Sequence, residues 1–252
     1  MSRRPHHGLA ALALIAAAPA ALTAQSGSGD GFLFGAPRGA LVLRVGFDQP
    51  VARGALFERL GRDLTLDRGS YGALNLGADV ALRLAPQLDL TLGAGWARSS
   101  ARSEYREFVE GDAGLPITQE TRFTRVPLTG TLRVFLTPRG QALSRFAWVP
   151  ARVAPYVGAG GGVVYYQLQQ TGDFIVDPAA LDIVTDTRRS SRWAPAGHAL
   201  AGAEFALSPR LGLVAEARYT VARAAVDALL PATPARIDLS GLQGTVGLSI
   251  RF

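Results

Sequence analysis

Apolar and polar residues alternate one by one along seven segments of this chain, and an eighth, glycine-rich stretch at 156–169 is also strand-like. A repeat of two is typical of β-strands whose faces meet different surroundings, because successive side chains of a strand point in opposite directions. Helical periodicity is weak, and after the N-terminus no window holds 18 consecutive apolar residues, which excludes a transmembrane helix. We therefore predict an all-β chain of eight strands that begin near Leu41, Leu74, Leu88, Val126, Tyr156, His198, Leu211 and Leu242.

The connections between these segments also alternate, between short and long. Pro86-Gln87 and Ser208-Pro209-Arg210 are short and contain turn-forming residues. We predict loops in the long polar stretches at 49–70, 99–121, 171–195 and 223–235. Short turns at one rim and long loops at the other are typical of outer-membrane barrels. The link at 137–154 should be short in this scheme but has 18 residues, so we predict a periplasmic insertion there.

Side-chain size and charge indicate which face of the strands points outward. Large apolar residues share one face, while the other carries Gly, Ala, Thr and single charges. The interior of an eight-stranded barrel is just wide enough for side chains, and an arginine facing lipid at mid-bilayer costs about 2–4 kcal/mol. We therefore predict an eight-stranded antiparallel up-and-down transmembrane β-barrel. A soluble, lipocalin-like barrel with leucines inside stays open as the alternative. The ionic network that we predict in the lumen consists of Arg44, Asp48, Asp79, Arg83, Asp89, Arg133, Glu204, Glu216, Arg218 and Arg251.

The first residues have the three parts of a secretory signal peptide. Arg3 and Arg4 precede an apolar run at 9–22, and small residues follow. That run is too short to span the roughly 30 Å of a bilayer's hydrocarbon core comfortably. We predict a signal peptide at 1–24, an N-terminal periplasmic segment at 25–38 and the barrel domain at 39–252. An N-terminal membrane anchor is the alternative.

Composition excludes several kinds of site and partner. The chain has no Cys, which rules out disulfides, thiolate metal ligands and a cysteine nucleophile. All 26 basic residues are Arg, and without the two in the predicted signal peptide, 24 of them stand against 20 acidic residues. These arginines are dispersed along the chain, so no basic stripe predicts a nucleic-acid partner.

Three stretches of the sequence carry a family resemblance. The chain ends at 244–252 in an alternating strand with a final Phe, and it has a glycine-rich stretch at 155–162 and a hairpin-like stretch at 205–219. These resemble small bacterial outer-membrane β-barrel proteins, the outer-membrane protein A/W-like eight-stranded barrels. The resemblance implies a location in the cell outer membrane of a Gram-negative-type envelope and insertion by the barrel-assembly machinery. It also implies that the assembly signal is formed by Leu248, Ile250 and Phe252.

A barrel of this kind has lipids as partners. We expect contacts with outer-membrane lipids and lipopolysaccharide, and we expect a monomer. Arg188, Arg189 and Arg192 lie in one predicted loop, and we hypothesise that they bind lipid phosphates, because guanidinium groups bind phosphate bidentately. Aromatic residues near strand ends predict interfacial girdles formed by Trp96, Tyr156, Tyr219 and Phe252.

One histidine raises the question of catalysis. His198 is the only histidine after the predicted signal peptide, so sites that need two imidazoles are absent. It shares a predicted face with Glu204 and lies near Ser190 and Ser191 in sequence, which raises a Ser–His–acid hypothesis. In the lipid A deacylase family a serine follows the histidine by two positions, and here that position is Leu200. We therefore predict a hydrogen-bonding lumenal histidine and no catalytic residue.

Two further patterns predict no cofactor. The glycines within 158–162 are followed by neither a helix pattern nor a lysine, which a phosphate-binding loop needs. The stretch with Asp173, Asp177, Asp182 and Asp186 lacks the regular spacing of a calcium loop. We expect neither a cofactor nor a metal.

The strand pattern predicts the wall of a barrel but not what its lumen or surface binds. Our leading hypothesis is a non-enzymatic outer-membrane barrel with a structural or surface role and a lumen largely closed by ionic side chains. A narrow channel for small or hydrophobic molecules is the alternative. A lipid A-modifying enzyme is the third reading.

Overall fold

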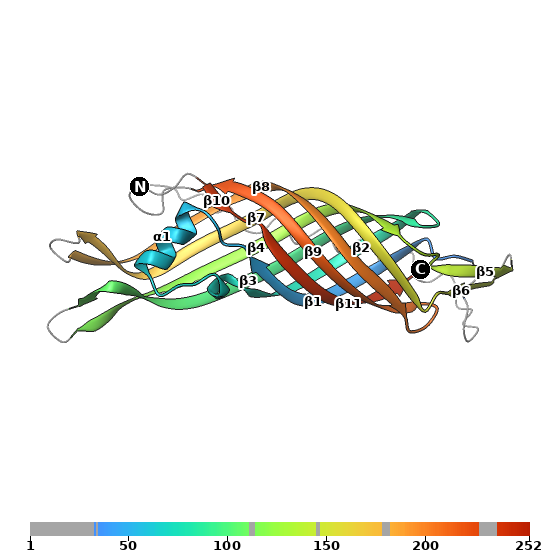
Figure 1. Cartoon of the computed structure of the whole chain (residues 1–252), viewed down its shortest axis with the longest axis horizontal. Helices are drawn as coiled ribbons and strands as arrows, with labels where there is room; N and C mark the ends of the chain where they lie inside the picture. The colour runs from blue at the N-terminus through green and yellow to red at the C-terminus, as the bar shows by residue number, and fades with distance from the viewer. Residues whose placement is uncertain (1–32, 34, 111–113, 145–146, 178–181, 227–235) are drawn as a thin grey trace, which may run out of the picture.

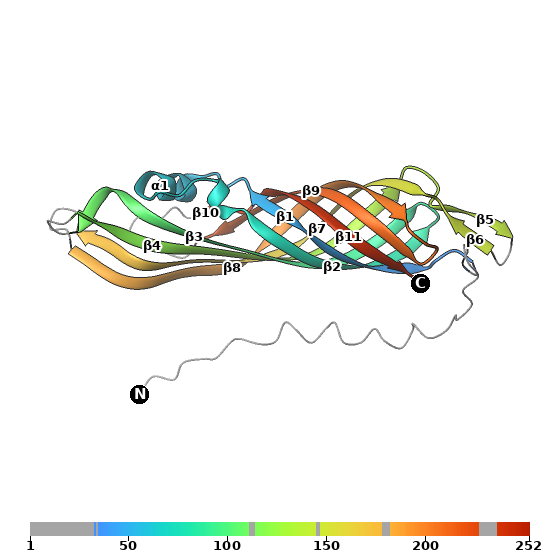
Figure 2. The same cartoon turned by 90° about the horizontal axis from the view of Figure 1, so that it is seen from below.

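The structure is a computed structural model, shown in Figures 1 and 2. It describes residues 33, 35–110, 114–144, 147–177, 182–226 and 236–252. The predicted signal peptide at 1–24 and most of the predicted segment at 25–38 lie outside these residues. The elements are β1 (Gly39–Pro50), α1 (Ala55–Asp63), the 3-10 helix η2 (Gly69–Tyr71), β2 (Ala73–Ala85), β3 (Leu88–Glu110), β4 (Leu115–Phe135), β5 (Gly140–Ser144), β6 (Ala147–Pro150), β7 (Val153–Asp177), β8 (Asp182–Ala206), β9 (Leu211–Ala225), β10 (Arg236–Asp238) and β11 (Gly241–Arg251).

Eight antiparallel strands form a closed ring. Going around it, the order is β1, β2, β3, β4, β7, β8, β9 and β11, and β11 pairs with β1 from Ala40 to Pro50, which is all but the first residue of β1. Closure gives every strand of the ring two neighbours, which satisfies the backbone hydrogen bonds that hydrocarbon leaves without water. The predicted eight-stranded antiparallel barrel is confirmed. In the part of the chain that the structure describes, neither helix has the length and hydrophobicity to cross a bilayer.

One end of the ring carries the short connections, and we call it the turn end. Residues 86–87 link β2 to β3, and residues 207–210 link β8 to β9 through a turn in which the Leu207 N–H donates to the Leu211 carbonyl at 3.0 Å. The C-terminus lies at this end (Figure 2). The insertion predicted at 137–154 is a folded hairpin, β5–β6, that projects from this end (Figure 1).

The opposite end, which we call the loop end, differs from the prediction. The stretches at 99–121 and 171–195 were expected to be loops, but β3 and β4 pair out to Glu110 and Leu115, and β7 and β8 pair out to Asp177 and Asp182. β3, β4, β7 and β8 therefore continue beyond the ring as a four-stranded sheet. The loop prediction is wrong here because the sequence signal for a strand was the alternation of apolar and polar residues, which arises where one face of the strand contacts lipid. These extensions form backbone hydrogen bonds between strands without such a lipid-facing side, so the alternation is missing.

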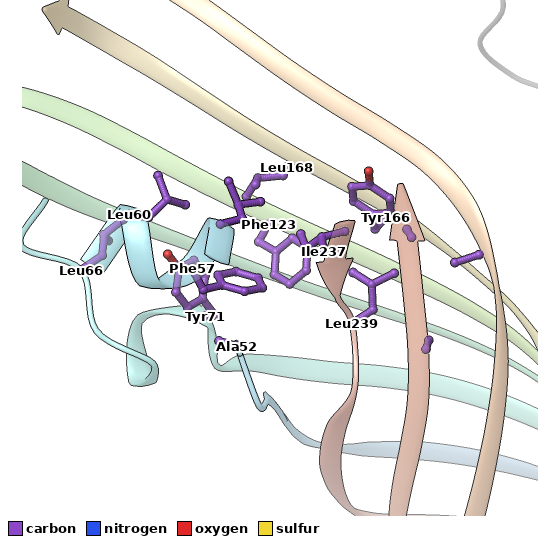
Figure 3. Packing of buried hydrophobic residues seen from close by; sticks show 14 of the residues in the cluster. Ala52, Phe57, Leu60, Leu66, Tyr71, Phe123, Tyr166, Leu168, Ile237 and Leu239 are labelled. Carbon is purple, nitrogen blue, oxygen red and sulfur yellow. The ribbon is translucent and has the colours of Figure 1, made fainter. Parts of the chain in front are cut away.

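The stretch at 49–70 also differs from the prediction of a polar loop. It contains α1, a helix of nine residues, and η2. Leu56, Phe57 and Leu60 form the buried face of α1 and pack into a hydrophobic cluster at the loop end (Figure 3). A helix with only three buried positions is too short for a helical period to stand out from the sequence. The predicted loop at 223–235 is described only in part: β9 continues to Ala225, and 227–235 lie outside the described residues.

The two faces of the ring have opposite chemistry. Outward leucines such as Leu43 and Leu74 are 50% and 60% exposed, whereas inward Asp79 and Arg133 are buried. Tyr156, which we predicted in an interfacial girdle, points inward and is only 2% exposed, so that prediction is wrong. The glycines that follow it at 158–162 have no side chains to reveal which face of β7 is which.

Candidate functional site

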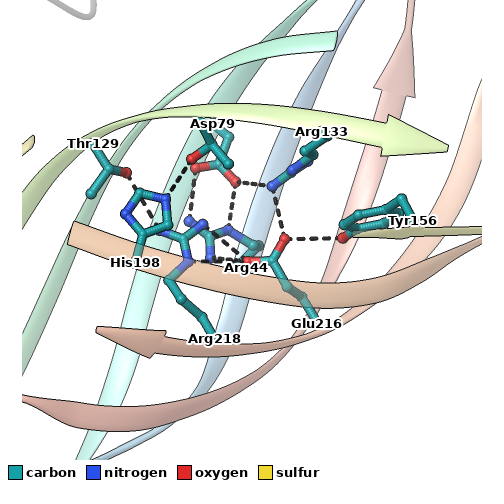
Figure 4. A network of polar contacts seen from close by, with 9 residues as sticks. Arg44, Asp79, Thr129, Arg133, Tyr156, His198, Glu216 and Arg218 are labelled. Atoms are coloured by element: carbon teal, nitrogen blue, oxygen red, sulfur yellow. Dashed lines mark hydrogen bonds and ion pairs between the residues drawn. The ribbon is translucent and has the colours of Figure 1, made fainter. Parts of the chain in front are cut away.

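The candidate site is an ionic layer in the middle of the lumen, shown in Figure 4. Inward positions of β1, β2, β4 and β9 bring its members together, because every second side chain of a strand points to the same face. Val42 pairs with Asp79 and Arg44 with Gly77, so Arg44 and Asp79 lie on adjacent rungs of the same inner wall. The layer, which we call the central layer, consists of Arg44, Asp79, Arg133, Glu216 and Arg218.

The two carboxylates of the central layer are each shared among arginines. Asp79 forms an ion pair with Arg44 at 2.6 Å and with Arg133 at 3.5 Å. Glu216 lies 2.9 Å from Arg133, 3.0 Å from Arg218 and 3.5 Å from Arg44. The Tyr156 hydroxyl donates to Glu216 at 3.0 Å. Three guanidiniums and two carboxylates thus occupy one buried layer with a net charge of +1.

His198 lies beside the central layer, and the described contacts give it no catalytic partners. Its Nε2 is 2.8 Å from the Thr131 hydroxyl, and its Nδ1 is buried with no hydrogen-bond partner among the described residues. Glu204 is paired with Arg251 at 3.0 Å, and the Ser190 hydroxyl lies 3.0 Å from that of Tyr166. The Ser–His–acid arrangement therefore does not form among these residues.

The remaining predicted lumen residues fall into two flanking groups. Toward the loop end, Asp48 pairs with Arg125 at 3.2 Å, and Arg125 donates to the Tyr71 carbonyl at 3.2 Å. Toward the turn end lies a second layer, which we call the turn-end layer. The turn-end layer consists of Arg83, Asp89, Arg139, Glu204 and Arg251, with Arg139–Asp89 at 2.7 Å and Arg251–Glu204 at 3.0 Å.

Two arginines of these groups were missing from the predicted network. Arg125 has the same parity as Arg133 on β4, so the alternation itself contained the signal for it. Arg139 lies in the link between β4 and β5, outside any alternating segment, and no sequence pattern pointed to it. Its guanidinium stacks over the Phe135 ring at 4.3 Å, which holds it at the mouth of the barrel.

An apolar cluster packs at the loop end of the barrel, and we call it the seal (Figure 3). Phe57 of α1 packs edge-on against Tyr71, with ring centroids 4.8 Å apart, and both rings lie within 6.3 Å of Phe123 on β4. Burial raises the pKa of the Tyr71 phenol well above its usual range, and the charge of Asp67 raises it further, so this hydroxyl stays neutral. The whole seal consists of Ala52, Leu56, Phe57, Leu60, Leu64, Leu66, Tyr71, Phe123, Tyr166, Leu168, Ala194, Ala222, Ala224, Ile237 and Leu239.

The outer surface carries an aromatic row toward the loop end. Trp96 pairs with Leu76, and Tyr165 pairs with both Val126 and Trp193, whose ring centroid is 5.3 Å from that of Tyr165. Within the next two rungs, the outward positions include three arginines, which we call the outer arginines: Arg98, Arg122 and Arg189. Tyr219 and Phe252 also face outward and are exposed.

The three arginines predicted to bind lipid phosphates together do not share a face. Arg189 is exposed on the outer face, where it donates to Gln169 at 3.4 Å. Arg188 belongs to the opposite face of β8, and its guanidinium lies 4.0 Å from the centre of the Phe174 ring. Arg192 has the parity of Arg188. The stretch was predicted as a loop, in which odd and even residue positions need not face opposite ways. It folds as a strand, in which successive side chains point to opposite faces, so the three arginines are divided between the two faces. Among the described residues, no group of three His, Asp or Glu side chains is arranged to hold a metal ion.

The comparisons with known proteins give structural neighbours only. No protein-family model matches the sequence, and no curated protein matches it. The chain is similar to Neisserial surface protein A, with 12% identity and a TM-score of 0.47 over 85% of this chain and 96% of that one. It is similar to a major outer membrane protein from Thermus thermophilus, with 13% identity and a TM-score of 0.45 over 86% of this chain and 100% of that one. It is also similar to the outer membrane protein OprG from Pseudomonas aeruginosa, with 14% identity and a TM-score of 0.43 over 86% of this chain and 98% of that one.

The chain's own geometry decides what kind of barrel this is. The ring is closed, its outer wall is a belt of large apolar side chains, and its inner wall carries paired charges. β-strands cross an outer membrane in this inside-out form, because lipid requires apolar side chains outside and no open sheet edge. The protein is therefore an integral eight-stranded β-barrel of the outer membrane.

Proposed function

We propose that this protein has a structural or surface role in the outer membrane, with a closed lumen and no catalysis of its own. The observation that carries the proposal is the central layer, in which Glu216 of β9 and Arg133 of β4 meet across the lumen at 2.9 Å. These strands are three places apart in the ring, so their contact spans the interior rather than following the wall.

Two barriers in series support a closed lumen. The central layer fills the middle of the lumen with long side chains that are ion-paired and almost fully buried. The seal then covers the loop end with apolar side chains from α1, η2, β10 and four strands of the ring. A hydrated ion would have to displace paired charges in the first barrier and cross a dry layer in the second.

The closed lumen predicts the electrical behaviour of the purified barrel. In planar bilayers we expect no steady single-channel steps at moderate voltage, because the two proposed barriers would interrupt any continuous water path. A general porin reconstituted in the same bilayers is the positive control. Regular steps from the wild-type barrel, changed in size by Arg133→Ala, would instead support the narrow-channel reading.

We also propose that the outer arginines hold lipopolysaccharide at the outer leaflet. They lie just beyond the row of Trp96, Tyr165 and Trp193, and aromatic residues of outer-membrane barrels gather where the hydrocarbon ends. Lipid phosphates lie at the same depth, and a guanidinium binds them with charge-assisted hydrogen bonds. The terminal residues Leu248, Ile250 and Phe252 remain the proposed signal to the barrel-assembly machinery, and a monomer remains the expected state.

The outer arginines give a testable prediction. Replacing Arg98, Arg122 and Arg189 with Gln should weaken lipopolysaccharide binding roughly tenfold or more, since three charge-assisted contacts are lost. Surface plasmon resonance on immobilised barrel measures the change. The matched control replaces three exposed arginines of the turn end, Arg38, Arg152 and Arg210, with Gln. Equal lipopolysaccharide affinities in the two triple variants would contradict the proposal. So would a difference in affinity between the two variants that stays the same when the lipopolysaccharide is dephosphorylated.

A further inference from the structure

A small cavity lies inside the turn end of the barrel. Its volume is about 30 Å³, and its walls include four arginines and two acids: Arg83, Arg133, Arg139, Arg251, Asp89 and Glu204. A volume of that size holds about two water-sized particles, which excludes a sugar or a nucleotide. The cavity lies between the turn-end layer and the central layer, because Arg133 belongs to the latter.

The charges around this cavity do not balance. Asp89 is paired with Arg139 at 2.7 Å, and Glu204 is paired with Arg251 at 3.0 Å. Among the described residues no carboxylate lies within ion-pair distance of Arg83, whose guanidinium donates to the carbonyls of Pro37 and Pro86 at 3.5 and 3.1 Å. The turn-end layer therefore has a net charge of +1, and the adjoining central layer also has a net charge of +1. Arg83 is half-buried and its charge is partly hydrated, but the excess charge of the central layer is buried, which is unfavourable unless an anion compensates it.

Two arginines that line the cavity also have unsatisfied hydrogen-bond donors. The Nε of Arg133 and the Nε and Nη2 of Arg139 are buried, with no hydrogen-bond partner among the described residues. The Arg133 side chain is only 5% exposed, so solvent does not satisfy its Nε. The Asp89 Oδ1 is a buried acceptor without a partner as well. Water would satisfy this oxygen, but a neutral molecule leaves the excess charge in place.

We propose that the turn-end cavity binds one small inorganic anion, of halide size or slightly larger, between Arg83 and Arg139, with the Nε of Arg133 at its inner wall. The guanidiniums supply the charge and the unsatisfied donors, and the cavity volume sets the size limit. Outer-membrane barrels turn their short links toward the periplasm, so the anion comes from the periplasmic side. The bound anion completes the ionic filling of the lumen.

The chain contains a reporter for this cavity. Trp148 of β6 lines it and is 3% exposed, while the other two tryptophans, Trp96 and Trp193, are exposed on the outer face. Replacing Trp96 and Trp193 with Phe leaves Trp148 as the only indole. Iodide, which quenches indole fluorescence, is then titrated at constant ionic strength against gluconate. We expect saturable quenching that chloride displaces, whereas the neutral quencher acrylamide gives no saturable component.

Charge variants in the single-tryptophan barrel identify the ligands. Arg83→Gln and Arg139→Gln should each weaken the apparent iodide affinity at least tenfold, and Asp89→Asn should strengthen it several-fold. Arg53→Gln removes an exposed arginine between β1 and α1 at the loop end, so it is the control and should leave the affinity unchanged. Heat-modifiable gel migration shows which variants form closed barrels. Linear quenching in the parent, failure of chloride to compete, or full affinity in a folded Arg83→Gln barrel would each overturn the proposal. If neither arginine variant folds, chloride competition in the parent barrel decides it.

Discussion

Glu216→Ala is expected to lower the free energy of unfolding by about 3–5 kcal/mol, because it removes one partner of a buried ionic network. Glu216 is the carboxylate on which Arg44, Arg133 and Arg218 converge, and its side chain is 1% exposed. Without it, three guanidiniums share the single carboxylate of Asp79, and the Tyr156 hydroxyl loses its acceptor. The central layer then has a net charge of +2.

The measurement is urea unfolding in lipid vesicles, followed by tryptophan fluorescence. Glu107→Ala is the control, because it removes an exposed glutamate from β3 beyond the ring. Glu216→Gln separates charge from shape: it keeps the volume and removes the charge, so it should fall between the wild type and Glu216→Ala. A Glu216→Ala barrel as stable as the Glu107→Ala barrel would show that the central layer contributes little to stability.

Leu60→Ala should lower the free energy of unfolding by about 2–5 kcal/mol, the usual range for a leucine cut back in a packed core. Leu60 is 2% exposed and belongs to the seal, where α1 meets the loop end of the barrel. The lost stability has two parts: the free energy of burying the apolar area that the truncation removes, and the cost of the cavity that it leaves. The same unfolding experiment measures it.

Leu143→Ala makes the same chemical change at an exposed site. Leu143 on β5 is 69% exposed, so its truncation leaves no cavity and should change stability by no more than about 0.5 kcal/mol. Hydrogen exchange gives a second readout, because Leu60→Ala should speed exchange in α1 and η2 before it affects the strands of the ring. Equal losses for the two leucine variants would mean that α1 does not seal the barrel.

The alternation predicted much of the wall of the barrel correctly. Leu43 and Leu74 face outward and Asp79 and Arg133 face inward, as parity on their strands requires. The assignment of alternate residues to the two faces does not depend on the rest of the structure. A shift of the strand register by one residue would turn every leucine of that strand into the lumen, which strongly disfavours such a shift. The links at 86–87 and 207–210 were equally readable, because turn-forming residues act locally.

The parts that the sequence did not predict depend on partners far away in the chain. α1 is stabilised by a hydrophobic cluster in which Phe57 and Leu60 share contacts with Phe123 of β4 and Ile237 of β10. The nine residues of α1 alone are too few for a stable or recognisable helix. The extension at 99–121 and 171–195 pairs through its backbone, which side-chain patterns do not report. The inward orientation of Tyr156 was not predicted, because the glycines that follow it in β7 have no side chains to show which face of the strand points inward.

The sequence by itself determined the number of strands in the ring and which residues of a strand share a face, because both follow from a local repeat of two. Side-chain size and charge then favoured apolar side chains facing lipid over a soluble barrel. Only the tertiary structure decided which charge meets which. Asp48 lies with Arg125, Asp89 with Arg139, and Glu216 with three arginines, so the ten predicted lumen residues form separate layers rather than one network. Strand tilt and stagger set these pairings, because they fix the height at which each inward side chain enters the lumen, and no local pattern records that height.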